Sequence, residues 1–144
     1  MTALAEVIIN CDGAARGNPG PAGAGAVVVA PDGTVLAEVA EGLGETTNNV
    51  AEYTAAIRGL EEAARLGALR VLLRSDSQLL INQLNGRYRV KTAHLVPLHR
   101  RIRDLVSSFE RVTFEHVPRA QNAEADRLAN VGVDAWLAAG GRER

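Results

Sequence analysis

The sequence predicts an α/β fold in which helices cover both faces of a mixed five-stranded sheet. Segments typical of strands and helices follow one another in the order β-β-β-α-β-α-α-β-α. The first three strand-like segments are joined by turns, which favours antiparallel pairing, whereas the later strands alternate with helices, which favours parallel pairing. One sheet containing both kinds of pairing is the economical arrangement.

Three short strands are expected to open the chain, at residues 5–12, 26–30 and 34–40. The segment 13–25 is rich in glycine and contains two prolines, so we expect it to form a turn. Pro31-Asp32-Gly33 joins the second strand to the third, and an Asp-Gly pair between β-prone runs indicates a hairpin. The opening is therefore predicted to be an antiparallel meander.

Helices and strands alternate in the rest of the chain. Residues 50–66 carry apolar side chains at helical spacing and are followed by Gly67, a helix stop. Further helices are predicted at residues 77–84, at 95–109, and from Asn122, as N-cap, to about residue 137. The remaining strands are predicted at residues 70–75 and 112–117.

Length and composition predict one domain. With 144 residues and 47% hydrophobic content, the chain can form one continuous core, and we expect a single domain over residues 1–144, ordered from about 5 to 138. Aromatic residues make up only 3%, so a stacking platform for bases is not expected. The net charge of −1 removes the general electrostatic argument for a nucleic-acid partner, although a local basic patch is compatible with it.

Cysteine content and hydropathy indicate the compartment. Cys11 is the only cysteine, which excludes an intramolecular disulfide and a cysteine-ligated zinc site and is typical of a reducing cytosol. The sequence has no secretory signal pattern, and no segment approaches the roughly 20 apolar residues of a membrane span. We therefore expect a cytoplasmic protein without a membrane partner. A monomer is the expected oligomeric state.

Four carboxylates fall where the predicted sheet passes into helices. Asp12 closes the first strand and Asp76 the fourth, while Glu52 lies in the first turn of one helix and Asp126 near the start of the last. In open α/β sheets, sites form where strand ends and helix starts converge. Clustered carboxylates raise one another's pKa unless a cation neutralises them, and Mg²⁺ and Mn²⁺ prefer such oxygen ligands. Two such ions roughly 4 Å apart can promote phosphodiester hydrolysis, so the acids predict a metal-dependent nuclease.

Each acid also has a purely structural interpretation. Asp12 could form a turn, Asp76 could cap the following helix, and Asp126 could be a solvated acid on a helix surface. Glu52 could be favoured by the helix dipole alone. However, small residues lie three, four and seven positions after Glu52, which indicates close packing of this helix and directs the carboxylate toward the sheet.

Four motifs support a more specific interpretation. They are Asp12-Gly13-Ala14-Ala15-Arg16-Gly17-Asn18-Pro19-Gly20-Pro21, Thr46-Thr47-Asn48-Asn49-Val50-Ala51-Glu52, Ser75-Asp76-Ser77-Gln78 and Asn122-Ala123-Glu124-Ala125-Asp126-Arg127-Leu128-Ala129. With these motifs in this order, the chain resembles the ribonuclease HI family, type 1 ribonuclease H, from Val7 to about Val131. The resemblance implies a ribonuclease H-like fold. It also implies cleavage of the RNA strand of an RNA–DNA hybrid by two divalent ions, leaving 5′-phosphate and 3′-hydroxyl ends.

The resemblance also assigns residues to roles. Asp12, Glu52, Asp76 and Asp126 match the four metal-binding acids of the family. Asn18, Asn48 and Gln78 match positions that contact the hybrid in the minor groove, where a 2′-hydroxyl distinguishes RNA from DNA, and Thr47 matches one that holds a DNA-strand phosphate. Turn and cap chemistry is the structural alternative for Asn18, Asn48 and Thr47.

The sequence departs from the family pattern before the last helix. Many members carry a histidine there, in a longer loop, that is thought to help product leave, but here only Pro118-Arg119-Ala120-Gln121 precedes Asn122. His116 lies on a predicted strand and is expected to be structural. Arg119 is the only charged residue of the loop and is the candidate substitute. The short loop looks like the branch of the family that lacks the histidine.

A second departure is the absence of the extended basic handle that some bacterial members insert. The expected substitutes are Arg87, Arg89, Lys91, Arg100, Arg101 and Arg103, although a solvated helical face explains these residues equally well. Members of the short-loop branch are sometimes fused to a phosphatase domain, so this chain could be one domain of a longer protein.

Two other functions stay open. A module that binds hybrids without cleaving them predicts loss of one or more acids, and all four are present. A nuclease that also cuts double-stranded RNA is the other alternative, because fold alone does not fix the substrate.

Overall fold

The computed structural model describes residues 5–141; the ends of the predicted domain, residues 1–4 and 142–144, lie outside the described residues. The strands and helices, in chain order, are β1 (Glu6–Ala15), β2 (Gly20–Val29), β3 (Val35–Thr46), α1 (Asn48–Arg65), β4 (Arg70–Ser75), α2 (Gln78–Leu84), α3 (Val96–Val106), β5 (Arg111–His116) and α4 (Ala123–Ala138). Short 3₁₀ turns precede α3 (η1, Ala93–Leu95) and α4 (η2, Arg119–Gln121).

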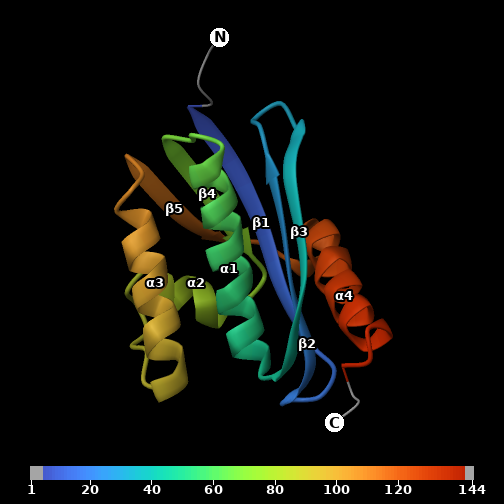
Figure 1. The fold of residues 1–144 in the computed structure, drawn as a ribbon. Coiled ribbons are helices and arrows are strands. Elements are labelled where there is room, and N and C mark those ends of the chain that lie inside the picture. The colour runs from blue at the N-terminus through green and yellow to red at the C-terminus, as the bar shows by residue number, and fades with distance from the viewer. Residues whose placement is uncertain (1–4, 142–144) are drawn as a thin grey trace.

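The strands form one mixed sheet in the order β3-β2-β1-β4-β5 (Figure 1). β1 pairs antiparallel with β2, and β2 with β3, whereas β4 pairs parallel with β1 and with β5. The predicted mixed five-stranded sheet is therefore confirmed. β1 lies at the centre of the sheet, but beyond Asn10 it pairs only with β2, so the side of its carboxyl end that faces β4 is not covered by a strand.

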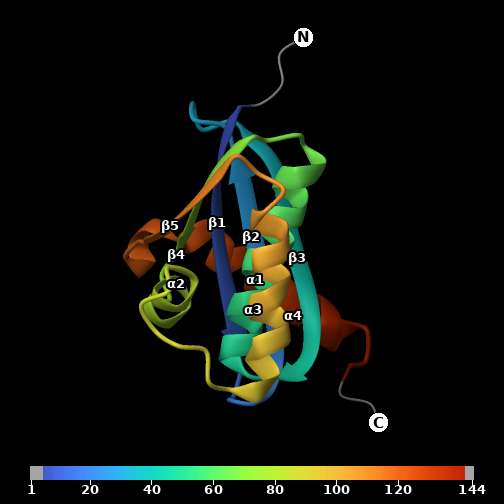
Figure 2. The same cartoon turned by 90° about the vertical axis from the view of Figure 1, so that its left-hand side faces the viewer.

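Helices lie on both faces of the sheet (Figures 1 and 2). On one face, α1 packs on β1 and β2, with α2 and α3 beside it. The main core lies between these elements, and its fully buried residues include Ile9, Leu60 and Leu73. On the other face, α4 packs on β1, β2 and β3. Within residues 5–141, no helix has the length and apolar character needed to cross a membrane.

The predicted turn at residues 13–25 is wrong over most of its length, because β1 and β2 extend through it and pair from Ile8–Val29 to Ala15–Ala22. The glycines in these strands allow α4 to approach the sheet closely. A Cβ at Gly23 would lie 2.2 Å from the carbonyl oxygen of Ala129, and a Cβ at Gly25 would lie 2.2 Å from that of Ala125. Glycine inside a strand often marks such a close backbone approach, and here it forms the surface beneath α4.

β3 is also longer than predicted, since it continues past residue 40 to Thr46. Gly42 lies in this extension, and a Cβ there would be 2.6 Å from the Cβ of Trp136 on α4. As in β2, the glycine lies in a strand because α4 packs closely over it. Residues 41–46 look irregular in the sequence, but packing against α4, which is distant along the chain, keeps them extended.

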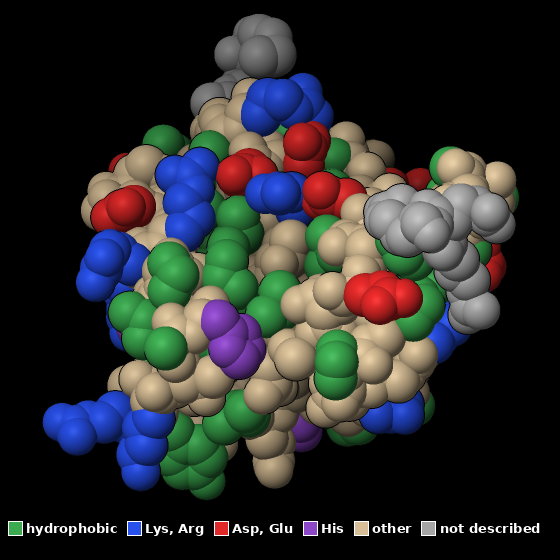
Figure 3. All heavy atoms as spheres, turned by 60° about the horizontal axis from the view of Figure 1, so that its bottom comes forward, with side chains coloured by type: hydrophobic (Ala, Val, Ile, Leu, Met, Phe, Trp, Pro, Cys, Tyr) green, Lys and Arg blue, Asp and Glu red, His purple; other side chains and the backbone are tan. Residues whose placement is uncertain are grey.

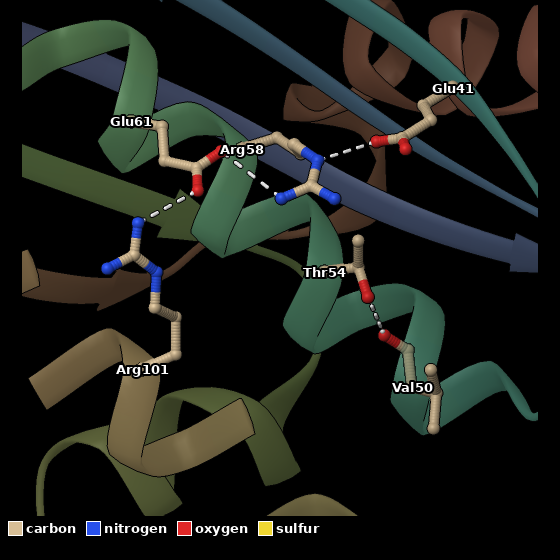
Figure 4. Close-up of polar contacts among 6 residues, drawn as sticks. All are labelled: Glu41, Val50, Thr54, Arg58, Glu61 and Arg101. Atoms are coloured by element: carbon tan, nitrogen blue, oxygen red, sulfur yellow. Dashed lines mark hydrogen bonds and ion pairs between the residues drawn. The ribbon is translucent and has the colours of Figure 1, made fainter. Parts of the chain in front are cut away.

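Ion pairs join β3, α1 and α3 on the outer side of the molecule (Figure 4). Arg58 on α1 contacts Glu41 on β3 (Nε–Oε1 2.7 Å) and Glu61 (Nη1–Oε1 3.1 Å), and Arg101 on α3 contacts Glu61 (Nη2–Oε2 3.1 Å). Seen from the lower end of Figure 1, acidic and basic side chains are interspersed over the upper part of the surface (Figure 3). Arg58 and Arg101 are therefore paired with acidic residues of the protein itself.

Replacing Arg58 with alanine removes two of these contacts at once. Because the partners are partly exposed, we expect Arg58→Ala to lower the free energy of unfolding by only about 1 kcal/mol, and less at high salt. Urea denaturation followed by circular dichroism measures this. Arg65→Ala, which removes a single pair within α1, is the matched control. An equal loss in both variants would contradict a linking role for Arg58.

Candidate active site

Three carboxylates converge at one end of the sheet, near the carboxyl ends of the inner strands β1 and β4. Asp12 lies on β1, Asp76 directly follows β4, and Glu52 lies in the second turn of α1. One carboxylate oxygen of each lies within 4.8 Å of the others. Two of the structural alternatives are now excluded, because Asp12 is inside a strand rather than a turn, and the N-cap of α2 is Ser77, whose Oγ accepts from Leu80 N.

Asp126 lies in the first turn of α4, with an exposed side chain. It is outside the group of three acids, yet all four acids, with Asn48 and Arg119, line the same hollow of about 330 Å³. The structure therefore places three acids inside the site and the fourth at its rim.

A second hollow, of about 280 Å³, lies on the sheet at β1, β4 and β5 and is lined by residues that include Ile8, Pro31 and Leu72. Its lining is mainly apolar, and its charged residues, Glu6, Arg70 and Arg111, lie away from the acids. It has no group of three potential metal ligands among the described residues. The chemistry therefore places the candidate active site at the acidic hollow.

Close contact between β1 and α1 brings Glu52 to Asp12. The backbone N–H of Gly13 donates a hydrogen bond to Oε1 of Glu52 (3.0 Å). A Cβ at Gly13 would lie 2.4 Å from the backbone of Ala51 and Glu52, so any larger residue would separate the strand from the helix. Sequence reasoning missed this role of Gly13, although its place directly after Asp12 was an available signal.

The small residues that follow Glu52 on α1 pack as predicted. Ala55 and Ala56 are fully buried, and a Cβ at Gly59 would lie 2.6 Å from Cγ2 of Ile9 on β1. The helix axis is therefore held close to the sheet along the face that carries Glu52. This contact directs the carboxylate inward.

Burial changes the protonation of two of the acids. Asp12 is 5% exposed and Glu52 is 6% exposed. Burial, reinforced by the negative charges of Glu52 and Asp76, raises the pKa of Asp12 to about 9. Burial also raises the pKa of Glu52 to about 8, against the opposing effects of the Gly13 N–H and the positive charge of Arg119. Such shifts are expected where buried carboxylates lack a counter-cation, so the site suits a divalent cation.

Asn122 joins the start of α4 to β1. It occupies the predicted N-cap position, but its side chain makes no capping hydrogen bond. Instead, Nδ2 donates to the carbonyl oxygen of Cys11 (2.9 Å), while Oδ1 has no partner among the described residues. The side chain is 1% exposed, so this bond is shielded from water. The predicted N-cap position is therefore confirmed, but the Asn122 side chain forms a buried link to β1 beside Asp12 in place of a capping hydrogen bond.

The candidate substrate contacts lie around the hollow. Thr47 is the N-cap of α1 and accepts from Val50 N (3.2 Å), and Oδ1 of Asn18 accepts from Asn48 N (3.0 Å). Thr47 therefore caps α1 locally, and Asn18 accepts from the first N–H of the same helix although it lies 30 positions away. Gln78 is the first residue of α2 and is exposed.

The short loop before α4 brings Arg119 to the site. Its Nε lies 3.5 Å from Oδ2 of Asp76, and its side chain is 90% exposed. His116 ends β5 and does not line the hollow. Among the expected basic substitutes, Arg101 pairs with Glu61, and Arg103 donates to the carbonyl oxygen of Leu84.

Comparisons with known proteins agree with this geometry. A family model described as reverse transcriptase-like matches residues 10–132. The bifunctional protein Rv2228c of Mycobacterium tuberculosis is 50% identical over 131 residues, which are 90% of this chain and 36% of that protein. A ribonuclease H of Halorhodospira halophila is 39% identical over 142 residues, covering 88% of this chain and 92% of its own. The chain thus spans only about a third of the mycobacterial relative.

A solved structure shows the same fold. LC11-RNase H1, determined in complex with an RNA/DNA hybrid, has a TM-score of 0.87 and 42% identity, covering 91% of this chain and 99% of that one. The mixed sheet with its acidic edge therefore defines a ribonuclease H-like protein. The length of the matches and their sequence identity establish more than the fold: the chain belongs to the ribonuclease H family.

The raised pKa of Asp12 predicts how stability depends on pH without metal. The folded state holds this proton up to about pH 9, whereas the unfolded chain releases it near 3.8, so stability should fall as pH rises between these values. Asp12→Asn should remove this effect and raise the free energy of unfolding at pH 8 by about 1 kcal/mol or more. Urea denaturation in EDTA measures it, with the exposed Asp104→Asn as control. Lower stability of Asp12→Asn than of the native protein under these conditions would refute the prediction.

Proposed function

We propose that this protein is an endonuclease that hydrolyses the RNA strand of RNA–DNA hybrids, giving 5′-phosphate and 3′-hydroxyl ends. The observation that carries the proposal is the convergence of three carboxylate oxygens within 4.8 Å in an open hollow. Membership of the ribonuclease H family supports the reaction class. The relative solved with an RNA/DNA hybrid supports the substrate.

The donor set of the hollow fits Mg²⁺, with Mn²⁺ as an alternative. Asp12, Glu52 and Asp76, with Asp126 at the rim, would hold two ions when substrate is bound. These ions would supply water activation and stabilisation of the leaving oxygen at the scissile phosphate. Within the protein, the Gly13 N–H fixes the orientation of the Glu52 carboxylate before substrate arrives. Preorganised ligands reduce the reorganisation that catalysis requires.

Substrate recognition is proposed to involve the elements around the hollow. Asn18, Asn48 and Gln78 would contact the minor groove, where the 2′-hydroxyl of RNA can be distinguished, and Thr47 would hold a DNA-strand phosphate. The exposed side chains of Arg87, Arg89 and Lys91, in the segment after α2, are available for further phosphate contacts. Recognition through shape and phosphates predicts weak dependence on base sequence. A cytoplasmic location and a monomeric state stay predictions.

Of the two alternatives, the presence of all four acids and the convergence of three argue against a hybrid-binding module without cleavage. Activity on double-stranded RNA is compatible with the same site, so both substrates belong in the test.

The first test compares cleavage of labelled hybrid, duplex RNA and duplex DNA in Mg²⁺, Mn²⁺ and EDTA. We expect metal-dependent cleavage of the RNA strand of the hybrid. Asp76→Asn should reduce it by at least about 100-fold, because loss of a metal ligand removes several kcal/mol of transition-state stabilisation. Asp104→Asn, an exposed acid on α3, is the matched control. Intact hybrid in every condition, with folded protein still bound to it, would establish the binding module instead.

Arg119 is proposed to assist turnover in place of the missing histidine. Its guanidinium lies beside Asp76 and is exposed, so it can reach a phosphate in the hollow. We expect Arg119→Ala to lower kcat by about tenfold, corresponding to about 1.4 kcal/mol, and Arg119→Lys to retain part of it. Steady-state kinetics on the hybrid provide the measurement. Unchanged kcat in Arg119→Ala would remove Arg119 from the mechanism.

A further inference from the structure

Arg16 contacts α4 from the loop between β1 and β2, which we call the Asn18 loop (residues 16–19). Its Nη1 lies 2.8 Å from Oδ1 of Asp134, and its Nη2 donates to Oδ1 of Asn130 (3.1 Å). Asn130 in turn donates from Nδ2 to the backbone carbonyl oxygen of Asp126 (3.0 Å). Because these three residues of α4 are four positions apart, they lie along one side of the helix. Arg16 is thus connected to the turn that carries Asp126.

The other side of the Asn18 loop is joined to α1. Oδ1 of Asn18 accepts from the backbone N–H of Asn48, which lies four residues before Glu52. The base of the loop is closed by a hydrogen bond from Arg16 N to the carbonyl oxygen of Pro21 (2.9 Å). The loop therefore connects the start of α1, the helix that carries Glu52, to the middle of α4, the helix that carries Asp126.

The Arg16 contacts contribute little to holding α4 on the sheet. The side chains of Arg16 and Asp134 are 41% and 68% exposed, and exposed ion pairs are usually weak. By contrast, Ala125, Ala129 and Val133 of α4 are fully buried. This packing fixes the helix without Arg16. What Arg16 restrains is the exposed loop.

We propose that Arg16 is a positioning residue that holds the Asn18 loop in the conformation that binds substrate. This inference rests on the proposed function, because it concerns the same hybrid-binding surface. A loop that is already ordered loses less conformational entropy on binding, so the restraint lowers KM rather than raising kcat. The partner is Asp134, an acidic residue that by itself would repel the phosphates of a hybrid.

The test uses steady-state kinetics on an RNA–DNA hybrid for Arg16→Ala and Asp134→Asn. Both should raise KM by about fivefold, which corresponds to about 1 kcal/mol, with kcat changed less than about twofold. The charge-exchanged pair, Arg16→Asp with Asp134→Arg, should recover part of the loss. Arg65→Ala, which also removes one exposed, ion-paired arginine, is the matched control and should leave KM unchanged.

The two single variants separate positioning from direct phosphate binding. If Arg16 bound phosphate itself, Asp134→Asn would free its guanidinium and remove a repelling charge, so KM would stay the same or fall. That result, an unchanged KM in Arg16→Ala, or an equal rise in Arg65→Ala would overturn the proposal.

A measurement without substrate keeps the inference independent of the catalytic proposal. The amide of Asn48 donates to the loop, so its hydrogen exchange, followed by NMR, should be faster in Arg16→Ala and Asp134→Asn than in the native protein. Unchanged exchange would overturn the positioning role even if the native protein cleaves hybrid. Faster exchange without any cleavage by the native protein would instead show that the proposed function fails while the loop restraint stands.

Discussion

The site depends on the backbone contact between β1 and α1 at Gly13. Because no side chain separates the strand from the helix there, the N–H of Gly13 reaches the carboxylate of Glu52, and Glu52 reaches Asp12. Gly59 repeats this close approach two turns further along α1, against Ile9. Together the two contacts fix the helix in both position and rotation.

This geometry opposes stability in the absence of a cation. Asp12 and Glu52 are buried next to one another and to Asp76. Their raised pKa values reflect the free-energy cost of burying negative charges close together. The fold accommodates them because packing elsewhere is extensive, with Ile9, Leu60 and many other apolar side chains fully buried. A fold of this size can support a destabilised site only if its core is otherwise well filled.

Local sequence patterns were sufficient to predict the order of elements and the edge at which the acids lie. Periodicity and turn residues depend on residues that are neighbours in the chain. Asp12 and Asp76 lie near the ends of strands and Glu52 lies near the start of a helix, so local patterns could place all three. Long-range contacts were not predictable in this way. Gly23 and Gly25 looked like turn residues because their partner, α4, lies about 100 positions away. For the same reason, the N-cap position of Asn122 was predictable, but the hydrogen bond from its side chain to a carbonyl 111 positions distant was not.

The different environments of the four acids suggest a division of work. Asp12 and Glu52 are buried on elements fixed by the core, so their relative position cannot adjust to substrate. Asp126 is exposed on α4, which reaches the site through polar links from Asn122 to the Cys11 carbonyl and from Arg16 through Asn130. The buried acids are therefore preorganised, whereas Asp126 lies on a helix fixed by buried residues but has its own side chain exposed to solvent. The surface of α4 is accordingly where substitutions can alter substrate binding without disturbing the core.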